Sequence, residues 1–535
     1  PFQFKWTSRF HKSALIFGGT VQYDDMEYVH EDGTGTLCSA WSESSRPKTY
    51  VQRDEEQAVL DDEGQPAFYK SGKNAGLPKT RKVKVPDLDR PKVRKCKAPF
   101  TFPGFTEPKQ EWASAEPGVY STASDVIEEL GVRDIPFLKA LAKLQSMAKD
   151  LSTYYMVEDE KTGERKGMLS LVGEDGIIHH GINHCSTVTG RFSSSNPNSQ
   201  NLPKGKKSDV KTVFTSRYPG GKIIQSDFSA LEVYVQAVLT GCTRLIADLR
   251  AGLDMHCLRL SASSGRPYDE VYRLCKGYTD EHGVGHPADP EWDAKRTDAK
   301  VFSFRRAYGA GAATIAAGTG IPLAEVEALI AAEEQMYPEI PSHFAKVTEQ
   351  IKKNRKPTGT AIPHPFVPGV MCNLGRSTHR TPDGKLYGYV ESPAPEYLCR
   401  KGITASFSPT QILNFSVQGT GAEVMKGGMW LAVRTFYRMK NFDGGACLIT
   451  TIHDAQVVDA SPEANDRAFA ILHASMTRAT ELLRRLFKWD WPLDVPTDTT
   501  LGINMGDENK YKVSPELAAW ADAEVMITLK AITRT

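Results

Sequence analysis

The sequence lacks any hydrophobic run that approaches the roughly 18 residues of a membrane span, and its start, PFQFKWTSRF, has no signal-peptide core. It also lacks Cys-x-x-Cys pairs: its nine cysteines are scattered, which excludes a zinc ribbon and fits a reducing compartment. An excess of charge is missing too, because 66 Lys and Arg oppose 65 Asp and Glu. We therefore expect a cytoplasmic protein without membrane contact, in which a polyanion would bind only at a local patch.

Charge is distributed unevenly over the first 120 residues. Residues 24–63 are acidic, whereas residues 70–97 hold eleven Lys and Arg against two Asp. Apolar residues show little periodicity there, which predicts a loop-rich arm. The basic stretch could lie along nucleic-acid phosphates, or it could be a solvated segment that balances its acidic neighbour. The sequence leaves both interpretations open.

Apolar residues at helical spacing predict long helices over residues 138–147, 323–336 and 411–439. Ser514-Pro515-Glu516 supplies the cap, the first position and the acidic first turn of a final helix. A polar, glycine-rich segment at residues 187–207 precedes KIIQSDFSALEVYVQAVLTG, which is typical of a strand that runs into a helix. A chain of 535 residues has room for about two to four domains.

Two aspartates follow apolar strand sequences. Asp227 comes after Ile223 and Ile224 at the predicted end of a strand, and Asp454 lies in the middle of LITTIHDAQVVDA, which predicts one apolar strand. Two such strands side by side would bring the carboxylates together, and their repulsion would require cations between them. Mg²⁺ prefers oxygen ligands, and two ions can serve phosphoryl transfer. Taken singly, each aspartate is more often a surface acid.

One predicted helix, DAKRTDAKVFSFRRAYGAG, carries a stripe of functional side chains. Arg296, Lys300, Phe304 and Tyr308 recur every four residues, so they share one face of a helix. Two cations followed by two rings match the phosphates, sugar and base of a nucleoside triphosphate. The alternative is an amphipathic helix with both rings in a core.

Four segments occur in an order that resembles family A DNA polymerases, the group of bacterial DNA polymerase I and many bacteriophage replicases. They are TGRFSSSNPNSQNLP (189–203), DFSALE (227–232), RTDAKVFSFRRAYG (296–309) and IHDA (452–455). The start, FQFKWTSRFHKSALIFGGT, is similar to the thumb of phage enzymes. The resemblance implies an α+β right-hand fold, with an antiparallel palm sheet, helical fingers and a helical thumb.

The resemblance also implies a division of the chain. We expect a thumb portion at 1–150 with a charged insertion at about 20–115, the first part of the palm at 151–235, fingers with insertions at 236–405, and the rest of the palm with a C-terminal helix at 406–535. One finger insertion is expected at 352–401. No complete exonuclease domain is expected in this chain: either the domain was lost, or it resides on a separate or removed polypeptide. A separate exonuclease-bearing polypeptide or a processivity factor is therefore a candidate partner.

By resemblance, Asp227, Asp454 and the backbone carbonyl of Phe228 hold two Mg²⁺ ions, and Lys300 joins the two aspartates in catalysis. The deoxynucleotide (dNTP) would contact Arg296, Lys300, Phe304, Tyr308, His256 and Glu232, with Glu232 blocking a ribose 2′-hydroxyl. The primer-template DNA would contact Arg191, Gln200, Asn201, Asn414, Gln418 and His453. The implied function is template-directed DNA synthesis from dNTPs in phage replication, in the cytoplasm of the host cell.

Several positions depart from the family pattern. Ala455 replaces the usual Glu after the aspartate, and the other departures are Ala230, Tyr234, Arg305 and Thr410. None removes an expected metal ligand, so we expect activity with altered primer contacts. Three alternatives remain: a single-subunit RNA polymerase, which Glu232 opposes, a catalytically idle scaffold that binds nucleic acid, and a metal-dependent nuclease, which would not need the triphosphate stripe.

Overall fold

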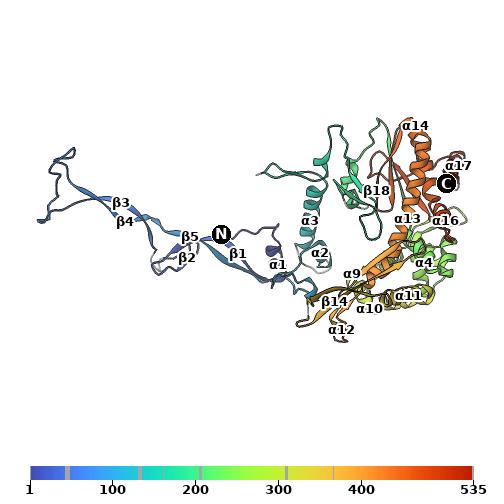
Figure 1. Cartoon of the computed structure of the whole chain (residues 1–535), viewed down its shortest axis with the longest axis horizontal. Helices are drawn as coiled ribbons and strands as arrows, with labels where there is room; N and C mark the ends of the chain where they lie inside the picture. Colours follow the sequence, from blue (N-terminus) through green and yellow to red (C-terminus); the bar gives the residue numbers. More distant parts are fainter. Residues whose placement is uncertain are drawn as a thin grey trace. The chain divides into compact units, whose positions relative to one another are not determined.

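The computed structural model describes residues 2–42, 48–130, 135, 137–160, 162–203, 208–307, 311–365 and 367–532, excluding the side chains of residues 111, 125, 128, 304, 305, 307, 317 and 318. The chain divides into two compact units, Pro1–Met147 and Ala148–Thr535 (Figure 1). In the described part of the chain, no helix combines the length and the apolar character that a membrane span requires.

The charged region of the first unit is a pair of long β ribbons, not the loop-rich arm that the sequence predicted. β1 (Gly19–Val29) pairs with β2 (Gly35–Leu37) and with β5 (Val93–Phe102), and β3 (Tyr50–Ala58) pairs with β4 (Thr80–Pro91), all antiparallel (Figure 1). The prediction failed because β3 is polar on both faces, and because the alternation of Val83 and Val85 in β4 is too short to indicate a strand of twelve residues.

The two ribbons place acidic strands against basic ones. Asp54 on β3 lies opposite Lys84 on β4, with 3.1 Å between carboxylate and ammonium. On the β1·β5 ribbon, Asp24 and Lys97 are 2.6 Å apart and pair in register. Opposite charges on directly facing residues stabilise an antiparallel pair. The acidic and basic stretches of the sequence therefore neutralise each other locally.

Helices complete the first unit. α1 (Arg9–Phe17) is capped by Ser8, and α2 (Ser124–Leu130) and the start of α3 (Leu138–Thr153) pack with Ile16 and Trp112 into a small core. The predicted helix at 138–147 is present, but its apolar stripe is only partly buried. Leu138 and Leu141 are buried, whereas Leu144 and Met147 are 48% and 59% exposed.

A five-stranded antiparallel sheet forms the centre of the second unit. Its order is β18 (Ala446–Ile452), β19 (Ala455–Ala460), β10 (Lys222–Phe228), β20 (Thr497–Gly502) and β21 (Asn509–Lys510). The main core of the unit lies between this sheet and the helices α4 (Leu231–Thr240), α13 (Pro409–Arg438), α15 (Asn465–Thr477), α16 (Ala479–Phe487) and α17 (Pro515–Ala531).

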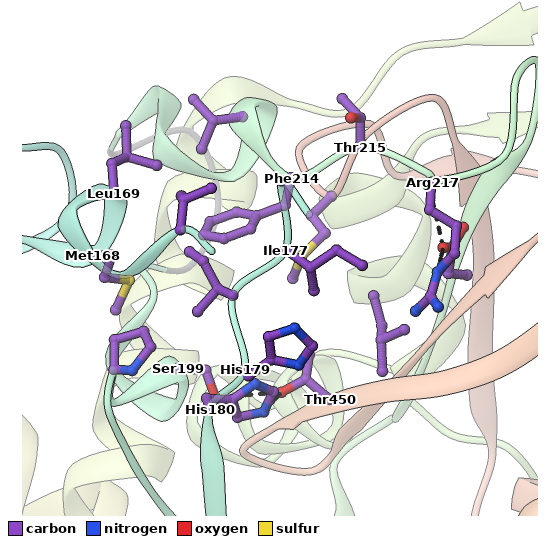
Figure 2. A pocket seen from close by; sticks show the side chains of 18 of the residues that line it. Met168, Leu169, Ile177, His179, His180, Ser199, Phe214, Thr215, Arg217 and Thr450 are labelled. Carbon is purple, nitrogen blue, oxygen red and sulfur yellow. Dashed lines mark hydrogen bonds and ion pairs between the residues drawn. The ribbon is translucent and has the colours of Figure 1, made fainter. Parts of the chain in front are cut away.

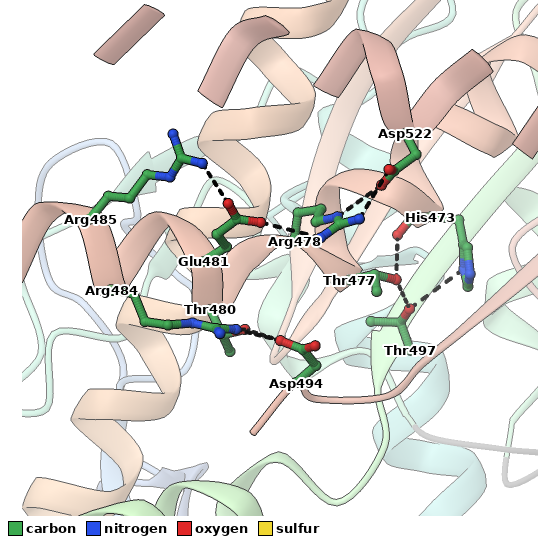
Figure 3. A network of polar contacts seen from close by, with 10 residues as sticks. All are labelled: His473, Thr477, Arg478, Thr480, Glu481, Arg484, Arg485, Asp494, Thr497 and Asp522. Atoms are coloured by element: carbon green, nitrogen blue, oxygen red, sulfur yellow. Dashed lines mark hydrogen bonds and ion pairs between the residues drawn. The ribbon is translucent and has the colours of Figure 1, made fainter. Parts of the chain in front are cut away.

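Local signals in the sequence correctly predicted two of these helices. α13 covers most of the predicted 411–439, and α17 begins where Ser514 caps it, since the Ser514 hydroxyl accepts a hydrogen bond from the Leu517 amide at 3.2 Å. Ion pairs fasten α16 to its neighbours: Arg478 lies 2.8 Å from Asp522 on α17 and 3.3 Å from Glu481 (Figure 3).

A mainly helical block lies between the two halves of the sheet sequence. It contains α5 (Thr243–Arg250), α6 (Met255–Ser264), α7 (Tyr268–Lys276), α8 (Pro290–Ala307), α9 (Ala312–Thr319), α10 (Leu323–Met336) and α11 (Glu339–Lys353). The bounds of α10 equal those predicted from periodicity. The segment before α8 folds into a small hairpin of β11 (Tyr278–Thr279) and β12 (Gly285–His286).

The expected insertion at 352–401 contains a three-stranded sheet of β13 (Lys356–Pro363), β14 (Met371–Arg380) and β15 (Leu386–Val390), called here the 356–390 sheet. Tyr387 and Tyr389 of β15 are fully buried against residues of α11 and α13. The remaining short elements are η1 (Gln110–Trp112), β6 (Val157–Glu158), β7 (Arg165–Lys166), η2 (Met168–Leu171), β8 (Gly181–Asn183), β9 (Ser193–Ser195), η3 (Ser199–Asn201), η5 (Asp209–Val213), β16 (Ser392–Pro393), α12 (Glu396–Cys399), β17 (Ala405–Ser406) and α14 (Lys440–Asp443).

Candidate active site

The two aspartates lie at the same end of two adjacent strands of the sheet. Asp227 is the penultimate residue of β10 and is exposed. The residue before it, Ser226, faces Gln456 of β19, so Asp227 lies beside the point where β19 begins. Asp454 directly precedes β19. The fold therefore brings both carboxylates to one edge of the five-stranded sheet.

Asp454 does not lie inside a strand, which corrects the prediction from the sequence. LITTIHDAQVVDA contains two strands, β18 and β19, and Ile452 pairs with Ala455 across a two-residue turn of His453 and Asp454. His453 has a φ of 54°, a left-handed conformation that closes such a turn. The prediction failed because apolar residues continue on both sides of the turn and no Gly or Pro marks it.

Gln200 holds the backbone of this turn. Its side-chain amide donates a hydrogen bond to the Thr451 carbonyl, and its side-chain oxygen accepts one from the His453 amide at 2.7 Å. Gln200 comes from η3, far from the turn in the sequence. A single side chain therefore fixes the backbone directly before Asp454.

Arg191 connects the turn to helix α4. Its guanidinium donates a hydrogen bond to Glu232 at 3.0 Å and lies 3.8 Å from a carboxylate oxygen of Asp454. Glu232 lies in the first turn of α4, where a carboxylate is favoured by the helix dipole. All three side chains are partly buried, which strengthens their electrostatic interaction.

On α8, Arg296 is held by a residue that the sequence did not single out. Asp254 accepts two hydrogen bonds from Arg296, at 2.6 and 3.1 Å, and caps α6 by accepting from the amides of His256 and Cys257. Burial by itself would raise the pKa of Asp254, but the hydrogen bonds from Arg296 and Cys257 and the nearby positive charge lower it overall. Asp254 is therefore ionised, and its carboxylate holds the Arg296 guanidinium in place.

His256 is a neutral ring beside α8. Its Nδ1 lies 3.1 Å from the Ser303 hydroxyl. Burial, together with the positive charges of Arg259, Arg296 and Lys300, lowers the pKa of His256 to about 4, although the nearby Asp254 carboxylate opposes this shift. Lys300 lies one turn after Arg296 and is exposed. Tyr308 and the side chain of Phe304 lie outside the described residues.

The remaining predicted residues are placed as follows. Asn414 and Gln418 lie one turn apart on α13, where Asn414 is buried and Gln418 is half-buried. Asn201 is exposed in η3, and its carbonyl accepts a hydrogen bond from the Tyr154 hydroxyl at 2.6 Å. The structure therefore groups Asp227, Asp454, Glu232, Arg191, Gln200 and His453 at the sheet edge, and Arg296, Lys300 and His256 on and beside α8.

The sheet adds an acid that sequence reasoning missed. Asp498 of β20 lies directly opposite Asp227 of β10 and accepts a hydrogen bond from the Ser229 hydroxyl at 3.1 Å. Directly opposed residues of an antiparallel pair project from the same face. No sequence signal marked Asp498, since its relation to Asp227 depends on strand register. Among the described residues, no three His, Cys, Asp or Glu side chains gather closely enough to hold a metal ion.

The larger described cavity lies elsewhere on the second unit. It has a volume of about 750 Å³ and is lined by apolar residues such as Met168 and Ile177, by His179 and His180, and by Arg217 (Figure 2). None of the predicted site residues lines it. A smaller cavity of about 230 Å³ includes His256 and Ser303 in its wall.

Comparison with known proteins identifies the family. The family model described as DNA polymerase family A matches residues 105–507. The thermostable DNA polymerase I of Thermus aquaticus is 26% identical over 396 residues, which is 72% of this chain and 38% of the relative. DNA polymerase I of Pseudomonas aeruginosa is 25% identical over 390 residues, which is 72% of this chain and 35% of the relative. The chain thus spans less than two fifths of the length of these curated relatives.

A solved structure shows the same fold. The polymerase domain of Pol1 from M. smegmatis, in a complex with DNA primer-template and dNTP, matches with a TM-score of 0.50 and 19% sequence identity. The match covers 74% of this chain and 58% of that one. The predicted fold class, a mixed palm, fingers and thumb architecture, is confirmed. Because the family model covers well over half of the sequence, the chain belongs to DNA polymerase family A.

Proposed function

We propose that this protein is a template-directed DNA polymerase that extends a DNA primer with dNTPs. Membership of the family supports the reaction. The observation that carries the proposal is the contact of Arg191 with both Glu232 and Asp454, beside the strand that bears Asp227. In this proposal Glu232 senses the sugar, Arg191 contacts the minor groove, and Asp227 and Asp454 bind metal ions, so residues for three functions lie in one cluster.

The donor set at the sheet edge suits Mg²⁺. Asp227, Asp454 and the backbone carbonyl of Phe228 offer only hard oxygen ligands, which Mg²⁺ prefers over nitrogen or sulfur. We assign these three residues as the ligands of two ions. When bound, the ions supply charge neutralisation for the attacking and leaving oxygens of an in-line displacement.

The residues of α8 and its neighbours bind the incoming nucleotide in this proposal. Arg296, preset by Asp254, and Lys300 hold the triphosphate oxygens, and neutral His256 offers a hydrogen bond without adding charge. The primer 3′-hydroxyl gives up its proton to solvent as its oxygen attacks the α-phosphorus. A new P–O bond forms, the bond from that phosphorus to the bridging oxygen breaks, and pyrophosphate leaves toward Lys300. We assign Phe304 and Tyr308 to the sugar and base of the nucleotide, and Glu232 to the exclusion of a 2′-hydroxyl.

The remaining assignments concern DNA and biological context. Arg191, Asn414 and Gln418 read minor-groove acceptors, which are present on every base pair and therefore report pairing geometry. Gln200, Asn201 and His453 adjoin the primer-template. We assign the thumb, palm and fingers to the ranges expected from the sequence, propose replication of a bacteriophage genome in its host's cytoplasm, and propose that a second polypeptide supplies exonuclease or processivity functions.

Primer extension with purified protein tests the proposal. We expect dNTP addition that requires a divalent cation, little use of ribonucleotides, and at least a thousandfold loss in Asp454→Asn with unchanged primer-template affinity. Asp443→Asn, at an exposed acid in α14, is the matched control and should retain full activity. Ribonucleotide use would indicate an RNA polymerase, strand cleavage a nuclease, and DNA binding without extension an idle scaffold; each would refute the proposal.

A further inference from the structure

Lys385 connects the 356–390 sheet to the segment that carries Arg191. It lies directly before β15, and its ammonium donates hydrogen bonds to the Thr189 carbonyl at 2.8 Å and to the Glu423 carboxylate at 2.9 Å. Glu423 lies on α13, where Lys426 is a second cation at 3.6 Å. One side chain therefore joins three segments that are distant in the sequence.

The turn gripped by Lys385 has a fixed shape. Gly190 has a φ of 74°, and its amide donates a hydrogen bond to the Thr187 carbonyl at 3.0 Å. The Thr187 hydroxyl in turn donates to the Arg191 carbonyl at 2.7 Å. A Cβ at Gly190 would collide with the Lys385 ammonium, so the ammonium occupies the space where a side chain would be. Lys385 thus supports the backbone directly before Arg191, through its hydrogen bond to Thr189 and its contact with Gly190.

The support beneath Lys385 is rigid. Tyr387, two residues further along, is fully buried, and its hydroxyl lies so close to Gly419 of α13 that no side chain would fit there. Tyr389 is also buried, and its ring stacks on Phe415 of α13. Such packing fixes the start of β15 relative to α13. Lys385 therefore fixes the turn of residues 187–191 relative to the packed core that β15 forms with α13.

We propose that Lys385 is a positioning residue that sets the reach of Arg191, and that the 356–390 sheet thereby contributes to the choice between matched and mismatched primer ends. The inference rests on the proposed function, in which Arg191 reads the minor groove. Lys385 acts through the Thr189 carbonyl and does not need to touch DNA. A correctly paired terminus places its minor-groove acceptor within reach of the Arg191 guanidinium. Displacement of Arg191 therefore lowers the extension rate more for matched than for mismatched primer ends.

The test compares single-nucleotide extension of matched and mismatched primers by wild type, Lys385→Met and Lys385→Arg. We expect Lys385→Met to lower kcat on matched ends about tenfold, to leave the primer-template Kd unchanged, and to lower the matched-to-mismatched ratio. Lys385→Arg should restore part of the ratio, because it keeps a cationic donor. Lys401→Met, at an exposed lysine of the same insertion, should behave as wild type. An equal loss on both primers would overturn the proposal.

A double-mutant cycle separates positioning from general damage. In an Arg191→Ala background, Lys385→Met should change kcat by less than about twofold, since the side chain that it positions is gone. Independent, multiplying losses would refute the inference. If Lys385→Met fails to fold, Glu423→Gln takes its place, because it weakens the contact that holds the Lys385 ammonium. The proposal then requires that Glu423→Gln lower the matched-to-mismatched ratio of kcat in the same way. A wild type that extends neither primer would instead refute the proposed function.

Discussion

Asp227 faces Asp498 across the pairing of β10 with β20, so two carboxylates project from the same face of the sheet edge. Like charges directly opposite each other destabilise an antiparallel pair by a few tenths of a kcal/mol to about 1 kcal/mol. A bound cation would relieve this repulsion. If the proposed metal site is correct, the stability of the sheet should therefore depend on divalent metal.

The first prediction follows from that link. Asp498→Asn should raise the melting temperature in the presence of a chelator, because it removes one of the two facing charges while keeping an acceptor for Ser229. The rise in melting temperature on adding Mg²⁺ should be smaller than in wild type. Thermal unfolding with and without Mg²⁺ measures both effects. Asp490→Asn, an exposed acid outside the sheet, is the control, and identical Mg²⁺ responses in all three proteins would contradict the expectation.

The second prediction concerns the turn before Asp454. Gln200→Ala removes the hydrogen bonds to Thr451 and His453, which should cost about 1–2 kcal/mol of stability and allow the turn to open. We expect a fall in kcat of about ten- to a hundredfold with little change in DNA affinity. Hydrogen exchange of the His453 amide should rise in parallel. Ser195→Ala, at an exposed residue nearby, should alter none of these, and a Gln200→Ala protein of normal kcat would exclude the supporting role.

The third prediction concerns pH. Burial holds the pKa of His256 at about 4 in the folded protein, against 6.5 for the free side chain, so the unfolded chain binds a proton more readily as pH falls below 6.5. Stability is therefore lost between pH 6.5 and 4. Between pH 6.5 and 4, the free energy of unfolding of His256→Gln should fall by about 1–2 kcal/mol less than that of wild type. The difference is small because the His256 ring is partly exposed. Urea unfolding at several pH values measures it; His282→Gln is the exposed control, and parallel curves for His256→Gln and wild type would count against the assignment.

The fourth prediction concerns the charged ribbons. If β4 lay along DNA phosphates, replacing Lys82 and Lys84 by Gln would change the salt dependence of binding. The slope of the logarithm of the DNA-binding constant against the logarithm of the salt concentration would become shallower by about 0.9 for each lysine. Because Lys82 and Lys84 face Glu56 and Asp54, we expect the slope for primer-template binding to stay unchanged. Fluorescence anisotropy between 50 and 200 mM salt provides the measurement. A slope reduced by the full amount would show that the ribbon contacts DNA.

The features that the sequence predicted correctly are those determined by neighbours along the chain. The limits of α10 follow from the 3.6-residue period, and the start of α17 follows from Ser514 and Pro515. The strand that carries Asp227 near its end was also predicted, since the apolar Ile223 and Ile224 precede Asp227 and a helical pattern follows. The motif order also predicted the family and the fold class, which the comparisons confirm.

What the sequence did not predict depends on partners that are distant along the chain. Asp254, Asp498 and Lys385 were not singled out, because each acquires its place from strand register or from a contact between separate elements. The strand β3 was missed because it is polar on both faces, and β4 because its apolar alternation is limited to Val83 and Val85. The turn at His453 was missed for a different reason: apolar residues continue on both sides of it, and neither Gly nor Pro marks it.

The division of acid and base between partner strands constrains how the charged arm can evolve. Losing one residue from β3 alone would shift the register and turn every following side chain to the opposite face, so that Asp54 and Glu56 would no longer meet their lysines. Matched additions or losses on both strands would preserve every pair. Homologous arms should therefore differ in length by whole facing pairs, one residue on each strand, while their total charge stays near zero.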